Sequence, residues 1–321
     1  MAGKLPEIDY ASHPAYGGML EPHPGYREQA LAALKPVIEE MTAVEQERAR
    51  RFGYRHGYAE PVGEALVRQG VAPIQLAARS TDRIHAAARP VIDLVRARLE
   101  TTRAAGEPIK YKTALEAMDA QSRPELWAAV QDAIREAGML DLTAAYFGAE
   151  RAGLRSVGVL VNQPDQDWAN RLYRDVELET PPTAGFHIDS NGKCFVKAVL
   201  YLNDVGPDQG PFGLVPGSHR WSEGAQERIY RRAFDKSGLV VRSAKKRRMF
   251  ISLPREMQVK AEFGGDMLAG SPEADALLEQ EFVATGPRGQ LNLFDPEAIH
   301  RGGNVRRGER HVLLITCGAA W

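Results

Sequence analysis

Three side chains that can bind a metal ion indicate the chemistry available to this sequence. His187 and Asp189 stand two positions apart, and His300 follows much later in the chain. Residues two apart in an extended segment point to the same side, so an imidazole and a carboxylate face a common point. Two imidazoles and one carboxylate form the donor set that holds ferrous iron and leaves coordination positions open. We therefore predict that His187, Asp189 and His300 bind the metal and form the catalytic centre.

A His-x-Asp pair alone is a weak motif, because most such pairs are surface or turn residues that bind no metal. The neighbouring sequence favours a site. Pro181, Pro182 and Gly185 bring the chain to the pair from a loop, and residues 190–192 (Ser-Asn-Gly) supply turn residues after it. The pair is therefore expected at the end of a strand, where the mouth of a cavity can lie.

An arginine shortly after His300 adds a second chemical feature. Arg310 is followed by Val312 and Leu314 at alternate positions, so its side chain is expected to share their inward face. A guanidinium in an apolar interior requires an anion, and its paired donors suit a carboxylate. A 2-oxo acid that chelates iron would present its far carboxylate to Arg310. Asn162, at the end of an earlier strand, is a second candidate for contacting this cosubstrate.

Short strands are the elements that must position these residues. Many short apolar runs, separated by Gly/Pro-rich turns and without a regular alternation with helices, predict a mainly β core built as an antiparallel double sheet. The catalytic core is expected to span residues 151–321. Within it, the charged segment 222–260 is expected to be a partly helical insertion. The predicted strands are residues 157–161, 195–202, 291–294 and 312–316.

Residues 1–150 are expected to be mostly helical and to pack on this core. Residues 1–25 are interpreted as an extended arm. The region carries no recognisable catalytic motif, so a scaffold that covers a sheet is favoured over a part that closes over the substrate. Apolar spacing predicts helices at residues 26–51 and 82–104, kinked or interrupted at Pro36 and Pro90, and a third helix capped by Ser122 with Pro124 in its first turn.

Composition excludes several classes of partner. The chain has 321 residues, a formal net charge of −1 and a pI near 6.7, so no global field attracts nucleic acid or an anionic membrane. Cys194 and Cys317 cannot build a disulfide framework and fit a reducing interior. No apolar run has the length of a signal-peptide core or a membrane span. We expect a cytoplasmic protein that acts on a small molecule and binds neither nucleic acid nor membrane.

Four segments carry a resemblance to a known family, and the sequence Pro216-Gly217-Ser218-His219 is the most specific part of it. Together they resemble the phytanoyl-CoA dioxygenase (PhyH) family of Fe(II)- and 2-oxoglutarate-dependent oxygenases, over residues 157–316 less the insertion. The resemblance implies a double-stranded β-helix, the jelly roll shared with cupins. The matching segments are His187-Ile188-Asp189, Ala198–Val205, Gly210–His219, and His300–Asn304 with Arg310.

The resemblance also implies the activity. His187, Asp189 and His300 would hold Fe(II), and Arg310 would bind 2-oxoglutarate. With O2 the enzyme would hydroxylate an unactivated C–H bond of a small molecule and release succinate and CO2; an anionic biosynthetic intermediate is one candidate substrate. Related halogenases have a small residue at the carboxylate position, so Asp189 favours hydroxylation over chlorination. A cupin-like metalloenzyme that does not use 2-oxoglutarate, and a non-catalytic jelly-roll binding module, remain as alternatives.

Four further features have open interpretations. Arg301 stands where the family commonly has a small residue, and Val305 replaces a frequent hydroxyl-bearing residue. Lys197 shares strand parity with apolar neighbours, yet a lysine whose ammonium reaches solvent is the favoured interpretation. The basic run Arg242–Arg248 is interpreted as a solvated face of the insertion, with an electropositive lid for an anionic substrate as the alternative.

Overall fold

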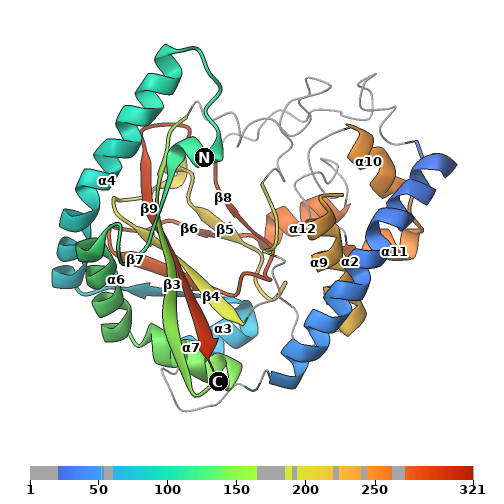
Figure 1. The fold of residues 1–321 in the computed structure, drawn as a ribbon, viewed down its shortest axis with the longest axis horizontal. Coiled ribbons are helices and arrows are strands. Elements are labelled where there is room, and N and C mark those ends of the chain that lie inside the picture. Colours follow the sequence, from blue (N-terminus) through green and yellow to red (C-terminus); the bar gives the residue numbers. More distant parts are fainter. Residues whose placement is uncertain are drawn as a thin grey trace.

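Two antiparallel sheets form the centre of the molecule (Figure 1). The computed structural model describes residues 21–51, 53, 61–164, 185–189, 194–219, 224–239, 244–261 and 272–320. The strands are β1 Val71–Gln75, β2 Leu115–Met118, β3 Arg151–Asn162, β4 Phe195–Tyr201, β5 Phe212–Leu214, β6 Phe282–Ala284, β7 Gln290–Phe294, β8 His300–Gly302 and β9 Arg310–Ala320. The larger sheet has the order β1-β7-β4-β9-β3-β2, and the smaller sheet has the order β6-β5-β8.

The path of the chain between the sheets is that of a double-stranded β-helix. The chain leaves the larger sheet after β3 and reaches the smaller one at His187, whose backbone forms an isolated antiparallel bridge with His300 in β8. It then returns to β4, crosses to β5 and β6, and continues through β7, β8 and β9 with one crossing at each step. The predicted jelly-roll core is confirmed.

The longest predicted strands lie at the centre of the larger sheet. β9 pairs with β3 on one side and with β4 on the other, and residues 312–318 of β9 pair on both sides. Helices cover the outer face and the barrel interior lies on the inner face, so both faces of β4 and β9 are mostly buried. Central strands of this kind are near-continuous apolar runs, which is why the sequence predicts them well.

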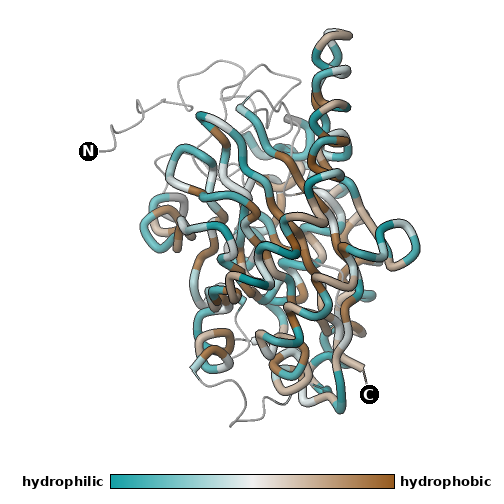
Figure 2. The backbone as a smooth tube through the Cα atoms, turned by 90° about the vertical axis from the view of Figure 1, so that its left-hand side faces the viewer, coloured by the Kyte–Doolittle hydropathy of each residue, from teal (hydrophilic) through white to brown (hydrophobic). Residues whose placement is uncertain are grey.

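Two groups of helices flank the sheets. One group packs on the outer face of the larger sheet, where Ile84, Val91 and Val95 join the core of the barrel. Figure 2 shows hydrophobic and hydrophilic residues interspersed along the backbone. This group comprises α3 Val62–Gln69, α4 Ala78–Ala104, α5 Tyr111–Ala114, α6 Pro124–Glu136 and α7 Met139–Phe147.

The second group, here called the helical lobe, lies beside the smaller sheet and has an apolar core of its own (Figure 1). Leu34, Met41, Phe234 and Phe250 form much of that core. The lobe joins two distant parts of the sequence, because α2 precedes the barrel and the other helices lie between β5 and β6. It comprises α2 Pro24–Arg51, α9 Ala225–Ser237, α10 Ala244–Ile251, α11 Arg255–Ala261 and α12 Pro272–Gln280.

Several expectations about the first half of the chain differ from the structure. The helices run through Pro36 and Pro90 without a break. Pro124 begins α6 as predicted, but Ser122 does not cap it, since its hydroxyl and backbone N–H bond to Asp119 instead. β1 and β2 join the larger sheet as edge strands although no strand is predicted there.

Two further findings concern the insertion and the chain ends. The helices between β5 and β6 continue to Gln280, beyond the predicted end of the insertion at residue 260. The predicted N-terminal arm falls largely on residues 1–20, outside the described residues. None of the helices in the described ranges is both long enough and apolar enough to cross a membrane.

Candidate metal centre

Strand alternation directs the side chains of the predicted ligand segment in two opposite directions. Phe186 and Ile188 are buried in the core of the helical lobe, 2% and 3% exposed. His187 and Asp189 between them face the interior of the barrel and line its cavity. This division gives the segment a fixed orientation, because a slip by one residue would expose two large apolar side chains. The extended conformation assumed from the sequence is confirmed.

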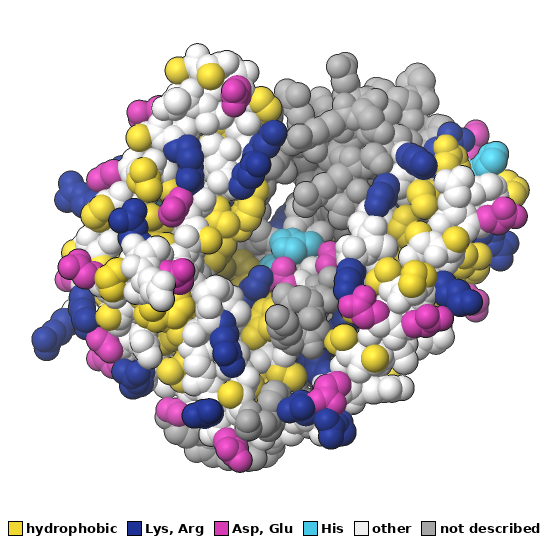
Figure 3. All heavy atoms as spheres, viewed as in Figure 1, with side chains coloured by type: hydrophobic (Ala, Val, Ile, Leu, Met, Phe, Trp, Pro, Cys, Tyr) yellow, Lys and Arg dark blue, Asp and Glu magenta, His cyan; other side chains and the backbone are white. Residues whose placement is uncertain are grey.

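The three predicted ligands meet inside the barrel. One potential ligand atom from each of His187, Asp189 and His300 lies within 4.8 Å of the others. The two histidines face each other with ring centroids 4.3 Å apart. In Figure 3 histidine side chains are visible in a hollow near the centre of the view. Among the described residues this is the one group of histidine, cysteine and acidic side chains that could hold a metal ion.

Hydrogen bonds fix the orientation of both imidazole rings. Nδ1 of His187 lies 2.7 Å from the carbonyl oxygen of Gly185, and Nδ1 of His300 lies 2.7 Å from that of Ala298. A carbonyl oxygen can only accept, so each Nδ1 carries the proton and each Nε2 keeps its lone pair for a metal. Burial of the ring and the neighbouring His300 lower the pKa of His187 to about 4, which keeps it neutral. This donor set fits a divalent ion such as Fe(II).

Asp189 is held as a carboxylate by its neighbours. Burial by itself would raise its pKa, but the neighbouring His300 and the charge of Lys197 lower the pKa far below the usual range. Oδ2 of Asp189 lies 3.4 Å from Nε2 of His300 and accepts a hydrogen bond of 2.7 Å from Nζ of Lys197. Lys197 therefore points into the barrel, and the favoured interpretation of a solvent-facing lysine is wrong.

Arg310 lies at the inner wall of the same cavity, as its strand parity predicts. Its side chain is 3% exposed, and Nε and Nη2 both donate to Oδ1 of Asn162, at 3.2 and 2.8 Å. No carboxylate pairs with Arg310 among the described residues, and burial lowers its pKa to about 10. The guanidinium is still charged at neutral pH. Asn162 orients it from the adjacent strand β3, in register with it.

A cavity of about 530 Å³ connects these groups. This is within the usual range for a small-molecule site. Its walls come mainly from the inner faces of β3, β4 and β9, with Tyr111 from α5 and Leu115 from β2. Apart from the polar groups described above, most of the lining is apolar. The residues that contribute to this lining include Val157, Leu160, Val199, Phe212, Phe294, Val312 and Ile315.

Contacts outside the barrel hold the two ligand segments in place. The hydroxyl of Ser218 accepts a hydrogen bond of 2.7 Å from the backbone N–H of Ile299, next to the distal histidine. Arg301 donates to both carboxylate oxygens of Glu281, at 2.7 and 2.5 Å, and lies 4.2 Å from the ring centroid of Phe186. Arg301, which departs from the family pattern, therefore connects the end of the insertion to both ligand segments.

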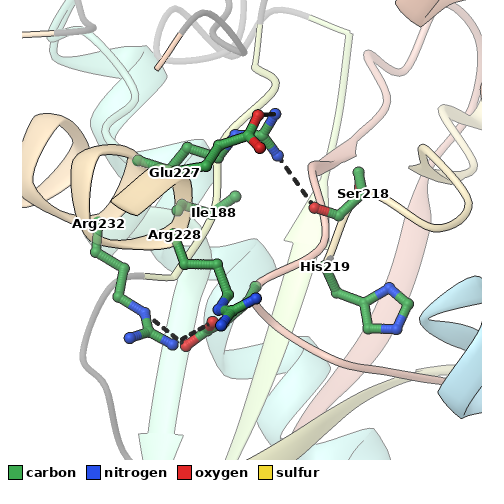
Figure 4. Close-up of a pocket in the computed structure, with 8 residues that line it drawn as sticks. Ile188, Ser218, His219, Glu227, Arg228 and Arg232 are labelled. Carbon is green, nitrogen blue, oxygen red and sulfur yellow. Dashed lines mark hydrogen bonds and ion pairs between the residues drawn. The ribbon is translucent and has the colours of Figure 1, made fainter. Parts of the chain in front are cut away.

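A buried ion network lies between the helical lobe and the ligand segments. Here the name denotes Glu45 and Arg48 from α2, Arg228 and Arg232 from α9, and Asp295 and Glu297 from the turn before β8. In Figure 4, Arg228 and Arg232 extend from α9 toward the same region, beside Ile188. Between Asp295 and Glu297, the carbonyl of Pro296 accepts the backbone N–H of Asp189 at 2.8 Å. The network thus supports the segment that holds Asp189.

The basic run of the insertion is more enclosed than expected. Arg247 is 4% exposed and its guanidinium lies 5.4 Å from the ring centroid of Phe250, while Arg248 lies 5.2 Å from that of Tyr26. These two arginines pack within the helical lobe. The interpretation of the basic run as a solvated face can therefore hold only for its other residues. Residues 240–243 lie outside the described ranges.

Comparisons with known proteins agree with the resemblance read from the motifs. The family described as "Phytanoyl-CoA dioxygenase (PhyH)" matches residues 26–312. No curated protein gives a significant match. Among solved structures, the non-heme alpha ketoglutarate dependent carbocyclase SnoK from nogalamycin biosynthesis is 15% identical, with a TM-score of 0.45, 84% of this chain covered and 87% of that chain. EctD from S. alaskensis with 2-oxoglutarate and 5-hydroxyectoine is 14% identical, with a TM-score of 0.48 and coverages of 85% and 80%.

Proposed function

Because the chain belongs to the phytanoyl-CoA dioxygenase family of Fe(II)- and 2-oxoglutarate-dependent oxygenases, we propose that it hydroxylates an unactivated C–H bond of a small molecule. The proposed iron ligands are His187, Asp189 and His300. The observation that carries the proposal is their convergence in a cavity with both Nε2 lone pairs directed inward. When bound there, iron would activate O2 while 2-oxoglutarate is converted to succinate and CO2.

The side chains of the barrel have separate tasks in this proposal. The two imidazoles supply neutral donors whose tautomer is fixed, and Asp189 supplies the anionic donor. Arg310 binds the far carboxylate of 2-oxoglutarate through paired donors, and Asn162 keeps the guanidinium in the plane that this contact needs. The apolar walls exclude water from the reacting groups.

Arg310 separates this function from the two alternatives. A buried guanidinium whose acceptor among the described side chains is an amide oxygen still needs an anion. A cupin-like enzyme that does not use 2-oxoglutarate, or a binding module without catalysis, gives no reason for such an arginine beside a possible metal site.

The test combines metal binding and cosubstrate binding without oxygen. We expect Fe(II) to bind the anaerobic protein and added 2-oxoglutarate to produce a visible charge-transfer band. Asp189→Ala should lose both signals, whereas Arg310→Met should keep the iron and lose the band at the same 2-oxoglutarate concentration. Arg83→Met, which removes an exposed arginine from α4, is the matched control and should keep both. Normal iron binding by Asp189→Ala would refute the ligand assignment, and an unchanged band in Arg310→Met would refute the role of that arginine.

A further inference from the structure

A lysine at the metal centre has no task in the function proposed above. Lys197 stands in the middle of β4, with its side chain 31% exposed. Its Nζ donates to Oδ2 of Asp189 at 2.7 Å. The same residue lines the cavity that holds the two histidines and Arg310. Lys197 is therefore within reach of any small molecule bound beside the metal.

The partner of Lys197 in this structure is also a predicted metal ligand. Oδ2 of Asp189 is the oxygen nearer to His300, 3.4 Å from its Nε2. An ion bound by this oxygen would withdraw electron density from it and bring positive charge close to the ammonium of Lys197, which weakens their attraction. With the metal in place, the ammonium needs another acceptor.

The charges in the cavity with metal and 2-oxoglutarate bound also indicate that Lys197 needs another anionic partner. Among the cavity-lining residues that the structure describes, the charged side chains are Asp189, Lys197 and Arg310, because histidines that bind a metal do so as neutral donors. Fe(II) and 2-oxoglutarate carry equal and opposite charges, so they leave this balance unchanged. One positive charge is then in excess in a mainly apolar cavity. An excess charge of this kind is costly unless an anion compensates it.

We infer that Lys197 binds the anionic group of the primary substrate, and that this group is a carboxylate. The inference rests on the proposed function, because it counts the metal and 2-oxoglutarate as bound. One excess positive charge matches a carboxylate, whereas a phosphate monoester carries nearly two negative charges at neutral pH. Since Lys197 contacts a metal ligand, the carboxylate binds close to the metal, and the oxidised carbon lies a few bonds from it.

The experiment measures charge preference with small probes instead of the unidentified substrate. The protein is loaded with Mn(II) and saturated with 2-oxoglutarate, and paramagnetic broadening of the probe's NMR signals reports binding near the metal. The probes are butanoate, its neutral analogue butanamide, and monobutyl phosphate. We expect the wild-type protein to bind butanoate most tightly, and Lys197→Met to lose roughly tenfold or more of that affinity, the value of one hydrogen bond to a charged group. Butanamide should bind both proteins equally.

Two further variants separate charge recognition from a general effect. Lys197→Arg keeps the charge and should restore the preference for butanoate at least in part. Lys236→Met removes an exposed lysine from α9, so it changes the net charge equally and should leave the preference intact. The inference is overturned if Lys197→Met keeps the wild-type preference, if the wild-type protein has none, or if monobutyl phosphate binds more tightly than butanoate.

Failure of this inference can be distinguished from failure of the proposed function. The charge-transfer band of the anaerobic Fe(II) protein with 2-oxoglutarate tests the function alone. A wild-type protein without that band contradicts the function and, with it, the inference. If the wild-type protein forms the band and Lys197→Met still prefers butanoate as strongly as the wild-type protein does, only the assignment of Lys197 is contradicted.

Discussion

Replacing Arg232 by methionine should destabilise the protein strongly, because Arg232 is the centre of the buried ion network. Its side chain is 1% exposed and donates to Glu297 at 2.9 and 2.5 Å and to Glu45 at 2.6 Å. Burial by itself would lower the pKa of Arg232, but the two carboxylates raise it. Methionine of similar length would leave both carboxylates buried with fewer donors.

The size of the effect follows from the burial of the partners. Removing one member of a buried ion pair costs about 3–5 kcal/mol, since the remaining charge is left without compensation in a medium of low polarity. Glu45 and Glu297 keep contacts with Arg228 and Arg48, so we expect a loss of about 3 kcal/mol, the lower end of that range. Arg83→Met is the matched control, because Arg83 pairs with Asp132 at an exposed site where such pairs contribute about 0–1 kcal/mol.

Urea unfolding at neutral pH, followed by circular dichroism, measures the free energy of unfolding of both variants. Because the turn that carries Glu297 holds the backbone of Asp189, the same Arg232→Met protein should also bind Fe(II) more weakly in an equilibrium titration. A loss of stability no larger than that of Arg83→Met would refute the reasoning, since the network would then contribute no more than a surface ion pair.

Three more outcomes can be measured on single variants. Glu309→Gln should destabilise the protein less as the pH falls from about 4.5 toward 2. Burial raises the pKa of Glu309, but hydrogen bonds from Arg96, Gln163 and His311 lower it from 4.5 to about 2, so its stabilising charge is lost in that window. A loss of stability in urea unfolding that does not depend on pH would contradict this. Gly210→Ala should lower stability by more than about 1–2 kcal/mol, because Gly210 has φ +65° and a Cβ there would lie 2.4 Å from the carbonyl oxygen of Gly303; unchanged thermal unfolding would exclude the clash. Asn162→Ala should raise the Kd for 2-oxoglutarate about tenfold by releasing the Arg310 guanidinium, an effect of about 1.4 kcal/mol measurable from the charge-transfer band; an unchanged Kd would show that Asn162 does not orient the arginine.

The barrel and its polar centre can be predicted from the sequence because the patterns that indicate them involve neighbouring residues. The central strands bury most of both faces and are therefore largely apolar. Arg310 stands at the start of such a run, and its parity with Val312 is enough to predict an inward direction. His187 and His300 are recognisable through their chemistry and the motifs around them. Each of these inferences needs only a few neighbouring residues.

The parts that the sequence does not disclose depend on distant contacts. Lys197 has the parity of an inward residue, but its partner, Asp189, becomes visible only when the fold brings them together. Glu45 and Arg48 resemble the exposed charges of any surface helix, and their partners, in α9 and in the turn before β8, lie far along the chain. Pro73 argues against a strand at β1, yet β1 pairs with β7 alone, and an edge strand tolerates a proline.

Local rules also fail where tertiary packing outweighs them. Pro36 removes a helical hydrogen bond, but Leu34 and Met41 on either side are buried in the helical lobe, and their packing keeps α2 in one piece. Ser122 and Glu125 have the spacing of a capping box, yet the Ser122 hydroxyl accepts the backbone N–H of Asp119, and the Ser122 N–H donates to the Asp119 carboxylate.

The bridge between His187 and His300 determines when the metal centre can exist. Each backbone N–H donates to the carbonyl of the other residue at 2.9 Å, so the two imidazoles are positioned by one pairing between segments separated by most of the helical lobe. Contacts between residues so far apart form late in folding, because closing a long loop costs entropy before any contact compensates for it. During synthesis the chain cannot offer the proposed iron site until β8 has left the ribosome and the lobe before it has folded. On the proposed assignment, iron loading therefore follows the pairing of these two segments, and a chain that ends before β8 lacks the proposed centre.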